Sequence, residues 1–214
     1  MPKTKRIQIL CLLGAVTLLL SGCWTEAPVE SANGLLGDQE PADQQEEVIL
    51  PAAFTLPYDP DQTLDPVTCA DGMQQVAGSL SSEGLFRLDR QLEPQPWLCL
   101  SYTYDAASLT YTFTLRSGVT FSDGSPLTAA DAAATLRRAK SSQRYSARLA
   151  HVAAVSAGDG VVIVTLSRPD SSLPALLDIP IVKSGTEESL TPVGTGPYYF
   201  TTDDAGAGLA SHSG

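Results

Sequence analysis

The fold of this chain is decided by residues 109–136, which read LTYTFTLRSGVTFSDGSPLTAADAAATL. In the first part of this stretch Tyr111, Phe113 and Leu115 alternate with threonines. A period of two residues is typical of a strand that buries one face. We therefore predict a half-buried strand here, with the two aromatic rings and the leucine in the core.

Two turns and a second, short strand are predicted next. Ser117-Gly118 and Asp123-Gly124 are turn signals, because glycine adopts backbone conformations that other residues avoid. Between the two turns the apolar alternation resumes. The pattern predicts strand, turn, short strand and turn.

A capped helix follows the second turn. Thr128 is predicted to be the helix N-cap, and Asp131 lies three residues later, where it can complete a variant of the capping box. The alanine-rich segment behind them ends in basic residues, which suit the negative end of a helix dipole. These residues are Arg137, Arg138 and Lys140.

Farther along, a helix and a hairpin are predicted. Tyr145, Leu149 and Val152 have the spacing of one face of a short amphipathic helix. The sequence GDG at 158–160 predicts a turn that joins two strands into a hairpin.

Residues 111–136 closely resemble the signature region of the family 5 extracellular solute-binding proteins, the peptide, dipeptide and nickel receptors of ABC importers. The sequence PVGTGPYYF at 192–200 is similar to the family's segment that crosses back to its first lobe, and EGLFRLD at 83–89 gives a third match. The matching positions include Arg116, Gly118, Asp123, Gly124, Gly194 and Gly196.

The resemblance implies a mixed α/β fold of the class II periplasmic-binding-protein type. It assigns residues 48–66 to the first strand and loop of lobe I, residues 67–190 to a peripheral α/β subdomain, and residues 191–214 to the return crossover into lobe I. Family members are more than twice as long as this chain of 214 residues and contain a second lobe. We therefore expect a truncated chain with the first lobe and the peripheral subdomain only, the second lobe being absent, and we expect half a cleft to bind weakly or not at all.

The start of the chain is predicted to be a secretion signal. Three basic residues precede an apolar run of 14 residues at 7–20, which is shorter than the roughly 20 residues of a membrane span. Residues 1–23 end in Leu-Ser-Gly-Cys, which resembles the bacterial lipobox. The resemblance implies that Cys23 is lipidated and becomes the new N-terminus. The alternative is an ordinary buried cysteine in an uncleaved anchor.

Acidic residues dominate the segment after the signal. Residues 24–47 hold seven acidic residues and no Lys or Arg, so they cannot bury a core and are predicted to form a disordered tether. The whole chain has a formal net charge of -11. Such an acid excess argues against nucleic-acid binding, which requires clustered basic residues.

The candidate ligand contacts come from the resemblance. In the family, the loop after the first strand lies close to the ligand cleft, and here that loop is YDPDQTLDP at 58–66. The candidates on it are Asp61, Gln62, Thr63 and Asp65; a plain surface turn is the alternative.

Structural roles are expected for the other matching residues. We expect Arg116 and Asp123 to form ion pairs or turns, and Gly194 and Gly196 to shape the backbone near the crossover.

The sequence does not support an enzyme. His151 and His212 have no metal-ligand spacing with each other or with cysteine. The motifs of nucleophile elbows, phosphate-binding loops and dinucleotide-binding turns do not occur, and no carboxylate pair is singled out. We expect no metal and no cofactor.

Two cysteines follow the tether, Cys69 and Cys99. In an oxidising compartment a disulfide between them would close a loop of about 30 residues and stabilise the fold by about 3 kcal/mol in the chain-entropy model. Two free, buried thiols are the alternative.

The resemblance implies a lipid-anchored substrate-binding protein of an ABC importer on the outer side of the cell membrane. It would capture peptides or related solutes and deliver them to the permease and ATPase subunits. One alternative is an orphan surface lipoprotein with an interaction role and no transport, and another is a secreted hydrolase. The ligand itself stays open among oligopeptide, dipeptide, nickel chelate and sugar.

Overall fold

A computed structural model describes residues 56–203 and 206–212. The predicted signal at 1–23, the tether at 24–47 and nearly all of the strand predicted at 48–56 lie outside these residues. The elements, in chain order, are α1 (Met73–Ser81), β1 (Phe86–Leu88), β2 (Pro94–Pro96), β3 (Cys99–Asp105), β4 (Thr110–Leu115), α2 (Ala129–Ser141), β5 (Val152–Ala157), β6 (Val161–Leu166), α3 (Leu173–Leu176), β7 (Tyr198–Asp203) and β8 (Gly206–Ser211).

The largest sheet is antiparallel and has the strand order β3-β4-β6-β5. Strand β4 confirms the predicted alternation, because Tyr111, Phe113 and Leu115 are buried and the threonines between them are half-buried. In the register with β6, Phe113 lies opposite Val162 and Tyr111 lies opposite Val164. One face of the sheet therefore carries a continuous row of apolar side chains.

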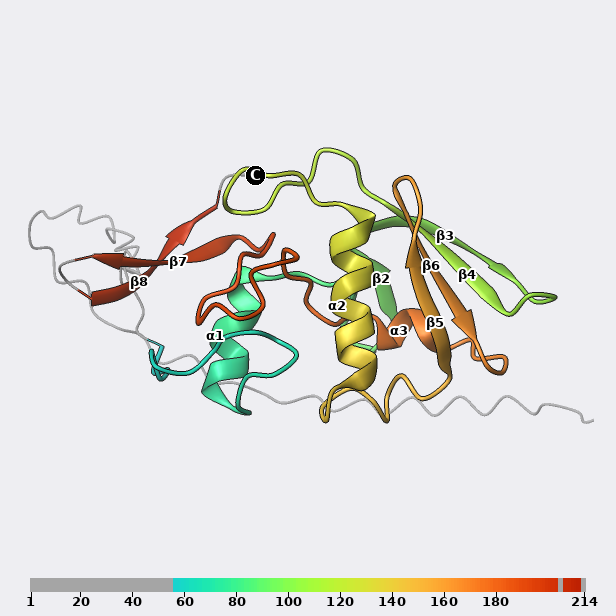
Figure 1. The fold of residues 1–214 in the computed structure, drawn as a ribbon, viewed down its shortest axis with the longest axis horizontal. Helices are drawn as coiled ribbons and strands as arrows, with labels where there is room; N and C mark the ends of the chain where they lie inside the picture. Colours follow the sequence, from blue (N-terminus) through green and yellow to red (C-terminus); the bar gives the residue numbers. More distant parts are fainter. Residues whose placement is uncertain (1–55, 204–205, 213–214) are drawn as a thin grey trace, which may run out of the picture. The chain divides into compact units, whose positions relative to one another are not determined.

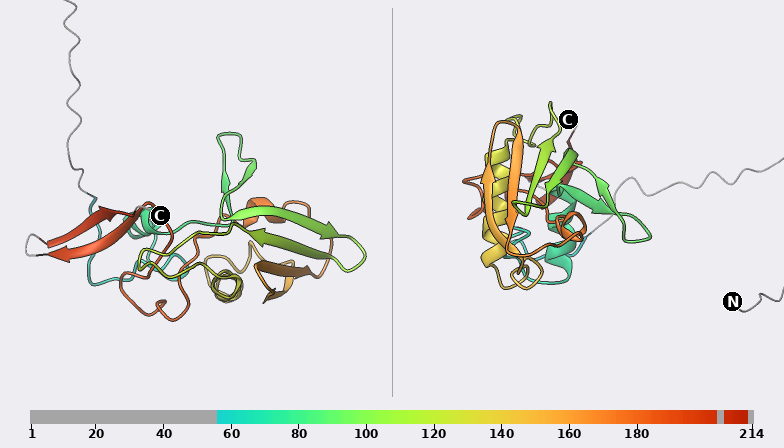
Figure 2. Two further views of the ribbon diagram at one scale, coloured as in Figure 1. Left: turned by 90° about the horizontal axis from the view of Figure 1, so that it is seen from above. Right: turned by 90° about the vertical axis from the view of Figure 1, so that its right-hand side faces the viewer.

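Helix α2 packs against the β5 and β6 side of the sheet (Figures 1 and 2). Its start is the predicted capping box: the Thr128 hydroxyl accepts a hydrogen bond from the Asp131 amide at 3.3 Å, and the Asp131 carboxylate accepts one from the Thr128 amide at 3.0 Å. Most of the buried side chains of α2 are small, which lets the helix approach the sheet closely. The buried residues of α2 are Ala129, Asp131, Ala132, Ala133, Thr135, Leu136 and Ala139.

Aromatic rings pack together on the side of β3 and β4, where Phe86 and Phe113 are buried and Tyr102 is exposed at the edge. The Phe86 ring meets the rings of Tyr102 and Phe113 at centroid distances of 5.7 Å, both in near-perpendicular orientation. Such edge-to-face pairs are the favoured geometry for aromatic side chains. The side chain of Phe86 therefore packs strand β1 against β3 and β4 of the main sheet.

The two glycine turns behave as predicted. Gly118 and Gly124 have φ of 77° and 80°, a left-handed region in which a side chain would be strained. The short strand expected between them is reduced to one isolated bridge from Thr120 to Pro126. The segment is too short to pair further before the second turn begins.

The predicted helix at 145–152 is wrong. Residues 143–151 form a run of turns, and Val152 already begins strand β5. Tyr145 and Leu149 are nevertheless both buried, and the Leu149 amide donates to the Tyr145 carbonyl at 2.9 Å. The apolar spacing therefore predicted the burial of Tyr145 and Leu149 correctly, although not the helix. The predicted hairpin is confirmed, since β5 and β6 pair antiparallel across the GDG turn at 158–160.

Helix α1 holds together the first loop and the last hairpin of the chain. The Gln74 side chain accepts a hydrogen bond from the Asp59 amide at 2.7 Å and donates to the Gln62 carbonyl at 3.1 Å. At its other end α1 contacts β7, which pairs with β8 (Figure 1). Within the described part of the chain, no helix combines the length and the apolar character that crossing a bilayer requires.

Candidate ligand-binding site

The loop with the predicted contacts is ordered by its own side chains. Asp59 accepts hydrogen bonds from the Asp61 amide at 3.0 Å and the Gln62 side chain at 2.7 Å. Thr63 donates to the Ser189 carbonyl at 3.1 Å. Asp61 and Gln62 are exposed and Thr63 is half-buried, so these three lie where a solute could reach them.

Asp65 lies apart from the other three candidates, because its side chain has no exposed surface. Its two carboxylate oxygens accept hydrogen bonds from Arg138 at 3.2 and 2.5 Å, and a third comes from the Thr68 hydroxyl at 2.7 Å. A carboxylate with these partners joins the loop to α2. The contacts expected from the sequence are thereby reduced to Asp61, Gln62 and Thr63.

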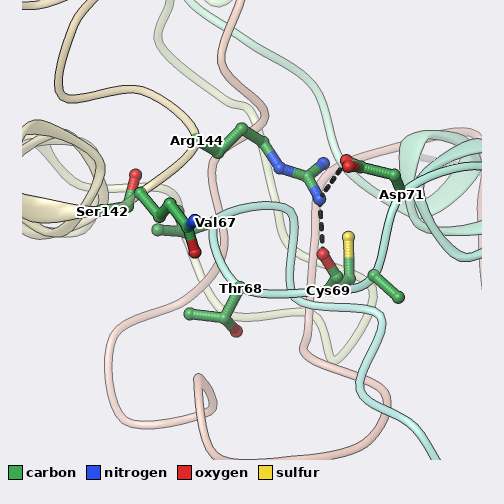
Figure 3. A pocket seen from close by; sticks show the side chains of 8 residues that line it. Val67, Thr68, Cys69, Asp71, Ser142 and Arg144 are labelled. Carbon is green, nitrogen blue, oxygen red and sulfur yellow. Dashed lines mark hydrogen bonds and ion pairs between the residues drawn. The ribbon is translucent and has the colours of Figure 1, made fainter.

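A cavity of about 610 Å³ opens directly behind this loop. One wall is the chain at 67–71, and the opposite wall is the polar segment that follows α2 (Figure 3). The volume is in the range of small-molecule sites. The lining residues are Val67, Thr68, Cys69, Ala70, Asp71, Ser142, Gln143 and Arg144.

Arg144 reaches across this cavity from one wall to the other (Figure 3). Its Nη2 atom donates to the Cys69 carbonyl and lies 3.0 Å from an Asp71 carboxylate oxygen. Its Nη1 atom is buried and has no hydrogen-bond partner among the described residues. The guanidinium is therefore fixed on one side, and its Nη1 atom lies inside the protein rather than on the open surface of the cavity.

The Cys69 thiol shares the cavity with Arg144. Burial raises the pKa of this thiol, and the Arg144 charge opposes that shift only in part. Cys69 and Cys99 are both buried free thiols, so the disulfide considered from the sequence does not form in this structure. The alternative of two separate thiols is the one that the structure has.

A second region lies where the crossover segment packs on α1. A Cβ at Gly194 would stand 2.0 Å from the Ser81 carbonyl oxygen, and one at Gly196 would stand 2.6 Å from the Leu80 carbonyl oxygen. Only glycine permits such close backbone contact. At both glycines the crossover backbone therefore packs directly against the end of α1.

Glu83 sits between two smaller cavities beside the crossover, of about 470 and 250 Å³. Its carboxylate accepts hydrogen bonds from the Trp97 indole at 2.7 Å and the Thr195 hydroxyl at 3.1 Å. Both carboxylate oxygens are thus engaged with the protein. This arrangement ties the crossover to the segment after β2.

Two further signature residues, Asp123 and Arg116, contact other groups of the protein. Asp123 forms an ion pair with Lys183 at 2.5 Å, and the hydrogen bond from Lys183, with further ones from Ser125, lowers the pKa of its carboxyl. Arg116 donates from Nε to the Trp97 carbonyl rather than to a carboxylate. Among residues 56–203 and 206–212, no group of three or more His, Cys, Asp and Glu side chains is arranged to hold a metal ion.

The sequence analysis missed Arg144. The only sequence signal was an arginine in the polar run SSQR that separates α2 from the buried Tyr145. Such a run is usually a solvated surface. Only the packing of residues 67–71 against it turns that surface into one wall of a cavity.

Comparison with known proteins gives a consistent family. The family model described as "Bacterial extracellular solute-binding proteins, family 5 Middle" matches residues 93–210, which is more than half of the chain. The glutathione-binding protein GsiB of Salmonella paratyphi A is 34% identical over 153 residues, and GsiB of Escherichia coli K12 is 33% identical. The match covers 65% of this chain and 30% of each of those proteins.

Solved structures agree with the fold. The binding protein MoaA from A. tumefaciens R10, in complex with mannopinic acid, has a TM-score of 0.62 and 27% identity, with 71% of this chain and 35% of that one covered. NikZ from Campylobacter jejuni, in complex with Ni(L-His), has a TM-score of 0.56 at 23% identity, with 70% and 33% covered. This chain therefore spans about a third of the length of its relatives. The predicted mixed α/β fold of the periplasmic-binding-protein type, as a partial lobe, is confirmed.

Proposed function

This chain belongs to the bacterial extracellular solute-binding proteins of family 5, and on that premise we propose that it serves as the substrate-binding component of an ABC importer. Proteins of this family bind solutes outside the cytoplasm and are not enzymes, which agrees with the motifs of the sequence. The proposed partners are a permease and its ATPase subunits. The observation that carries the proposal is the cavity of about 610 Å³ with polar side chains on both walls.

The solute we propose is a peptide or a related small polar molecule. The curated relatives at 33–34% identity are glutathione-binding proteins, and glutathione is a tripeptide. The cavity is large enough for part of such a ligand, with Thr68 and Gln143 as further polar side chains on its walls. Asp61, Gln62 and Thr63, on the adjacent loop, are proposed to contact the same solute.

The experiment is a titration of the 15N-labelled chain with glutathione, followed by NMR. Chemical shifts report binding even at millimolar dissociation constants, so a weak site is detected. We expect the largest changes at the amides of residues 67–71 and 142–144. Arg168→Gln, a charge change at an exposed residue outside the cavity, is the control and should leave the titration unchanged.

The proposal fails if neither glutathione nor trialanine shifts any amide of the cavity walls. It also fails if the changes gather on the sheet side, around β3 and β4, and leave residues 67–71 unaffected.

We further propose that the mature protein is held to the outer side of the cell membrane by a lipid on Cys23. The support is the agreement of a basic start, a short apolar run and the sequence Leu-Ser-Gly-Cys at 20–23. Cys23→Ser should move the protein from the membrane fraction to the soluble fraction. Unchanged partitioning would count against lipidation and would leave the solute-binding proposal intact.

For the domain organisation we propose a peripheral subdomain at 67–190 and a return crossover from 191. The buried apolar cluster runs from Val67 to Ile181, which supports one core for this subdomain. The crossover packs on α1 through Gly194 and Gly196, outside that core.

A further inference from the structure

A second binding site can be inferred beside the β1–β2 hairpin. We propose that the cavity of about 470 Å³ at this hairpin binds a small aromatic carboxylate, whose charged group is held by Arg87 and Arg116. This cavity shares no lining residue with the larger one of about 610 Å³, so a ligand here makes different protein contacts from the proposed solute. The argument depends on the two arginines, on the tryptophan that positions them, and on the charges around them.

The two arginines reach this cavity from different parts of the fold. Arg87 lies in β1, opposite Gln95 of β2 in the antiparallel register, and Arg116 directly follows β4. Both side chains line the cavity and both residues are exposed, so a ligand from solution can reach them. A guanidinium presents a planar fork of N–H groups that matches a carboxylate. Two such groups at one cavity favour an anionic ligand.

Trp97 positions both arginines. The guanidinium carbon of Arg87 lies 3.9 Å from the centre of the Trp97 ring, which makes a cation–π contact. Arg116 donates from Nε to the Trp97 carbonyl. The Trp97 ring is itself held, because its indole N–H donates to the Glu83 carboxylate at 2.7 Å. Groups that are held in this way lose little side-chain freedom when a ligand binds.

The charges at this cavity favour a ligand with one negative charge. Within residues 56–203 and 206–212, neither Arg87 nor Arg116 forms an ion pair. Glu83 also lines the cavity, but its two oxygens accept from the Trp97 indole and from the Thr195 hydroxyl at 3.1 Å. The two positive charges of the lining therefore exceed its negative charge by one, although the chain has a formal net charge of -11. A single carboxylate would balance this excess.

The other walls favour a ligand with an aromatic body. Pro96, Trp97 and Val119 line the cavity together with the arginines, and each is exposed or half-buried. The face of the Arg87 guanidinium that points away from Trp97 can stack on a ligand ring, because guanidinium groups stack on aromatic faces. The volume of about 470 Å³ is in the range of small-molecule sites. A ring with one carboxylate matches both the walls and the charge, whereas an inorganic anion would use the charge alone.

The test follows the fluorescence of Trp97, because this residue lines the cavity. The chain contains one other tryptophan, so Trp24→Phe leaves Trp97 as the only source of the signal. This variant is titrated with benzoate, with acetate, which lacks the ring, and with benzyl alcohol, which lacks the charge, all at an ionic strength matched with sodium chloride. We expect a saturable response to benzoate, with a dissociation constant about tenfold or more below those of the other two probes.

Three results of this titration would overturn the inference. The first is the absence of a saturable response to benzoate. The second is an equal affinity for acetate, which would show that the site binds any small anion. The third is an equal affinity for benzyl alcohol, which would show that the arginines do not bind the carboxylate.

NMR of the 15N-labelled chain locates the bound probe. We expect benzoate to shift the amides of residues 95–98 and 116–119 and to leave those of 67–71 and 142–144 unchanged. Benzoate shifts confined to 67–71 and 142–144 would overturn the inference, because the probe would then occupy the larger cavity. If benzoate behaves as expected but glutathione shifts no amide of the larger cavity, the second site stands and the solute proposal fails.

Variants separate the role of Arg87 from folding. Arg87→Gln should raise the dissociation constant for benzoate about tenfold or more, because a charge-assisted hydrogen bond is lost. Arg90→Gln is the matched control, since Arg90 is exposed on the same hairpin and does not line the cavity. Unchanged binding in Arg87→Gln, or an equal loss in Arg90→Gln, would overturn the inference. The dispersion of the amide spectrum shows whether each variant is folded. If Arg87→Gln is not folded, Arg87→Lys replaces it, and this variant should also bind benzoate more weakly because it lacks the planar fork.

Discussion

Arg138, in the last turn of α2, donates two hydrogen bonds to the carboxylate of Asp65, in the loop before α1. The two residues are 73 positions apart in the sequence. The Asp65 side chain is fully buried, whereas the Arg138 side chain keeps 28% of its surface exposed. The pair joins the loop of the candidate contacts to the helix that packs on β5 and β6. It also places the loop beside the cavity that Arg144 crosses.

Arg138→Met should destabilise the fold, because it leaves the Asp65 carboxylate buried with only the Thr68 side chain as partner. Breaking one side of a buried pair costs about 3–5 kcal/mol, and the partial exposure of Arg138 lowers our expectation to about 2–3 kcal/mol. Urea unfolding followed by circular dichroism measures the loss. The control is Arg90→Met on an exposed turn, and an equal, small effect of both changes would contradict the prediction.

Gly194→Ala should be among the most damaging small substitutions in the chain. The new methyl group would stand 2.0 Å from the Ser81 carbonyl oxygen and 2.3 Å from the Ser82 hydroxyl. The hydroxyl can rotate away, but the Ser81 carbonyl cannot withdraw without moving the end of α1. We expect a loss of about 2–3 kcal/mol in unfolding free energy, or failure to fold. Gly208→Ala is the matched control, since its methyl group meets only the Thr201 hydroxyl at 3.5 Å. Similar stabilities of the two variants would argue against the tight crossover contact.

The two thiols should be unreactive in the folded protein. Burial raises the pKa of Cys99 to about 11 and also raises that of Cys69, so almost no reactive thiolate is present at pH 7.5. Iodoacetamide should label neither residue within an hour in buffer and both within minutes in 6 M guanidinium, as resolved by peptide mapping. A peptide that joins Cys69 to Cys99 in the unreduced digest would contradict the free thiols.

Stability should be lost on acidification. Hydrogen bonds from Lys183 and then Ser125 lower the pKa of Asp123, and for Asp131 burial raises the pKa but is outweighed by hydrogen bonds from Thr128 and Ser184. Because both folded-state values lie below the unfolded value of 3.8, the ionised forms stabilise the fold. This contribution is complete well above pH 3.8 and disappears as the pH falls through 3.8 toward the folded values.

The measurement is the urea midpoint between pH 7 and pH 2.5. Asp131→Asn should lower the midpoint at pH 7 and make its decline below pH 4 shallower. Glu188→Gln, which removes an exposed carboxyl, should leave the curve as it is. If the parent and Asp131→Asn decline in parallel, the capping carboxylate does not contribute as described.

Local sequence patterns predicted most of the regular structure. Three features depend on interactions within a few residues: the alternation in β4, the capping box of α2 and the glycine turns. They could therefore be predicted from the sequence without knowledge of the fold. The predicted helix at 145–152 was wrong, because the same apolar spacing can also be buried by a run of turns. Its apolar spacing was real, but the chain buried Tyr145 and Leu149 through successive turns and used Val152 to start β5.

The candidate site was less predictable than the fold. Resemblance pointed to the loop at 61–65, and three of its four candidates are accessible. Asp65 turned out to be a buried partner of Arg138, because a carboxylate in a loop gives no sign of the cation that the folded chain brings to it. The position of Arg144 in the cavity was not predicted, because its partners Asp71 and Cys69 lie 73 and 75 residues away in the sequence.

The sequence by itself determined the family, the half-buried strand and the capped helix, because these follow from motifs and periodicities that short segments carry. Tertiary structure alone decided which polar side chains are free. It gave Asp65 three hydrogen-bond donors and enclosed the Nη1 atom of Arg144 within the protein. Whether a charged group is satisfied depends on atoms brought together from distant parts of the chain, and no local pattern encodes that meeting.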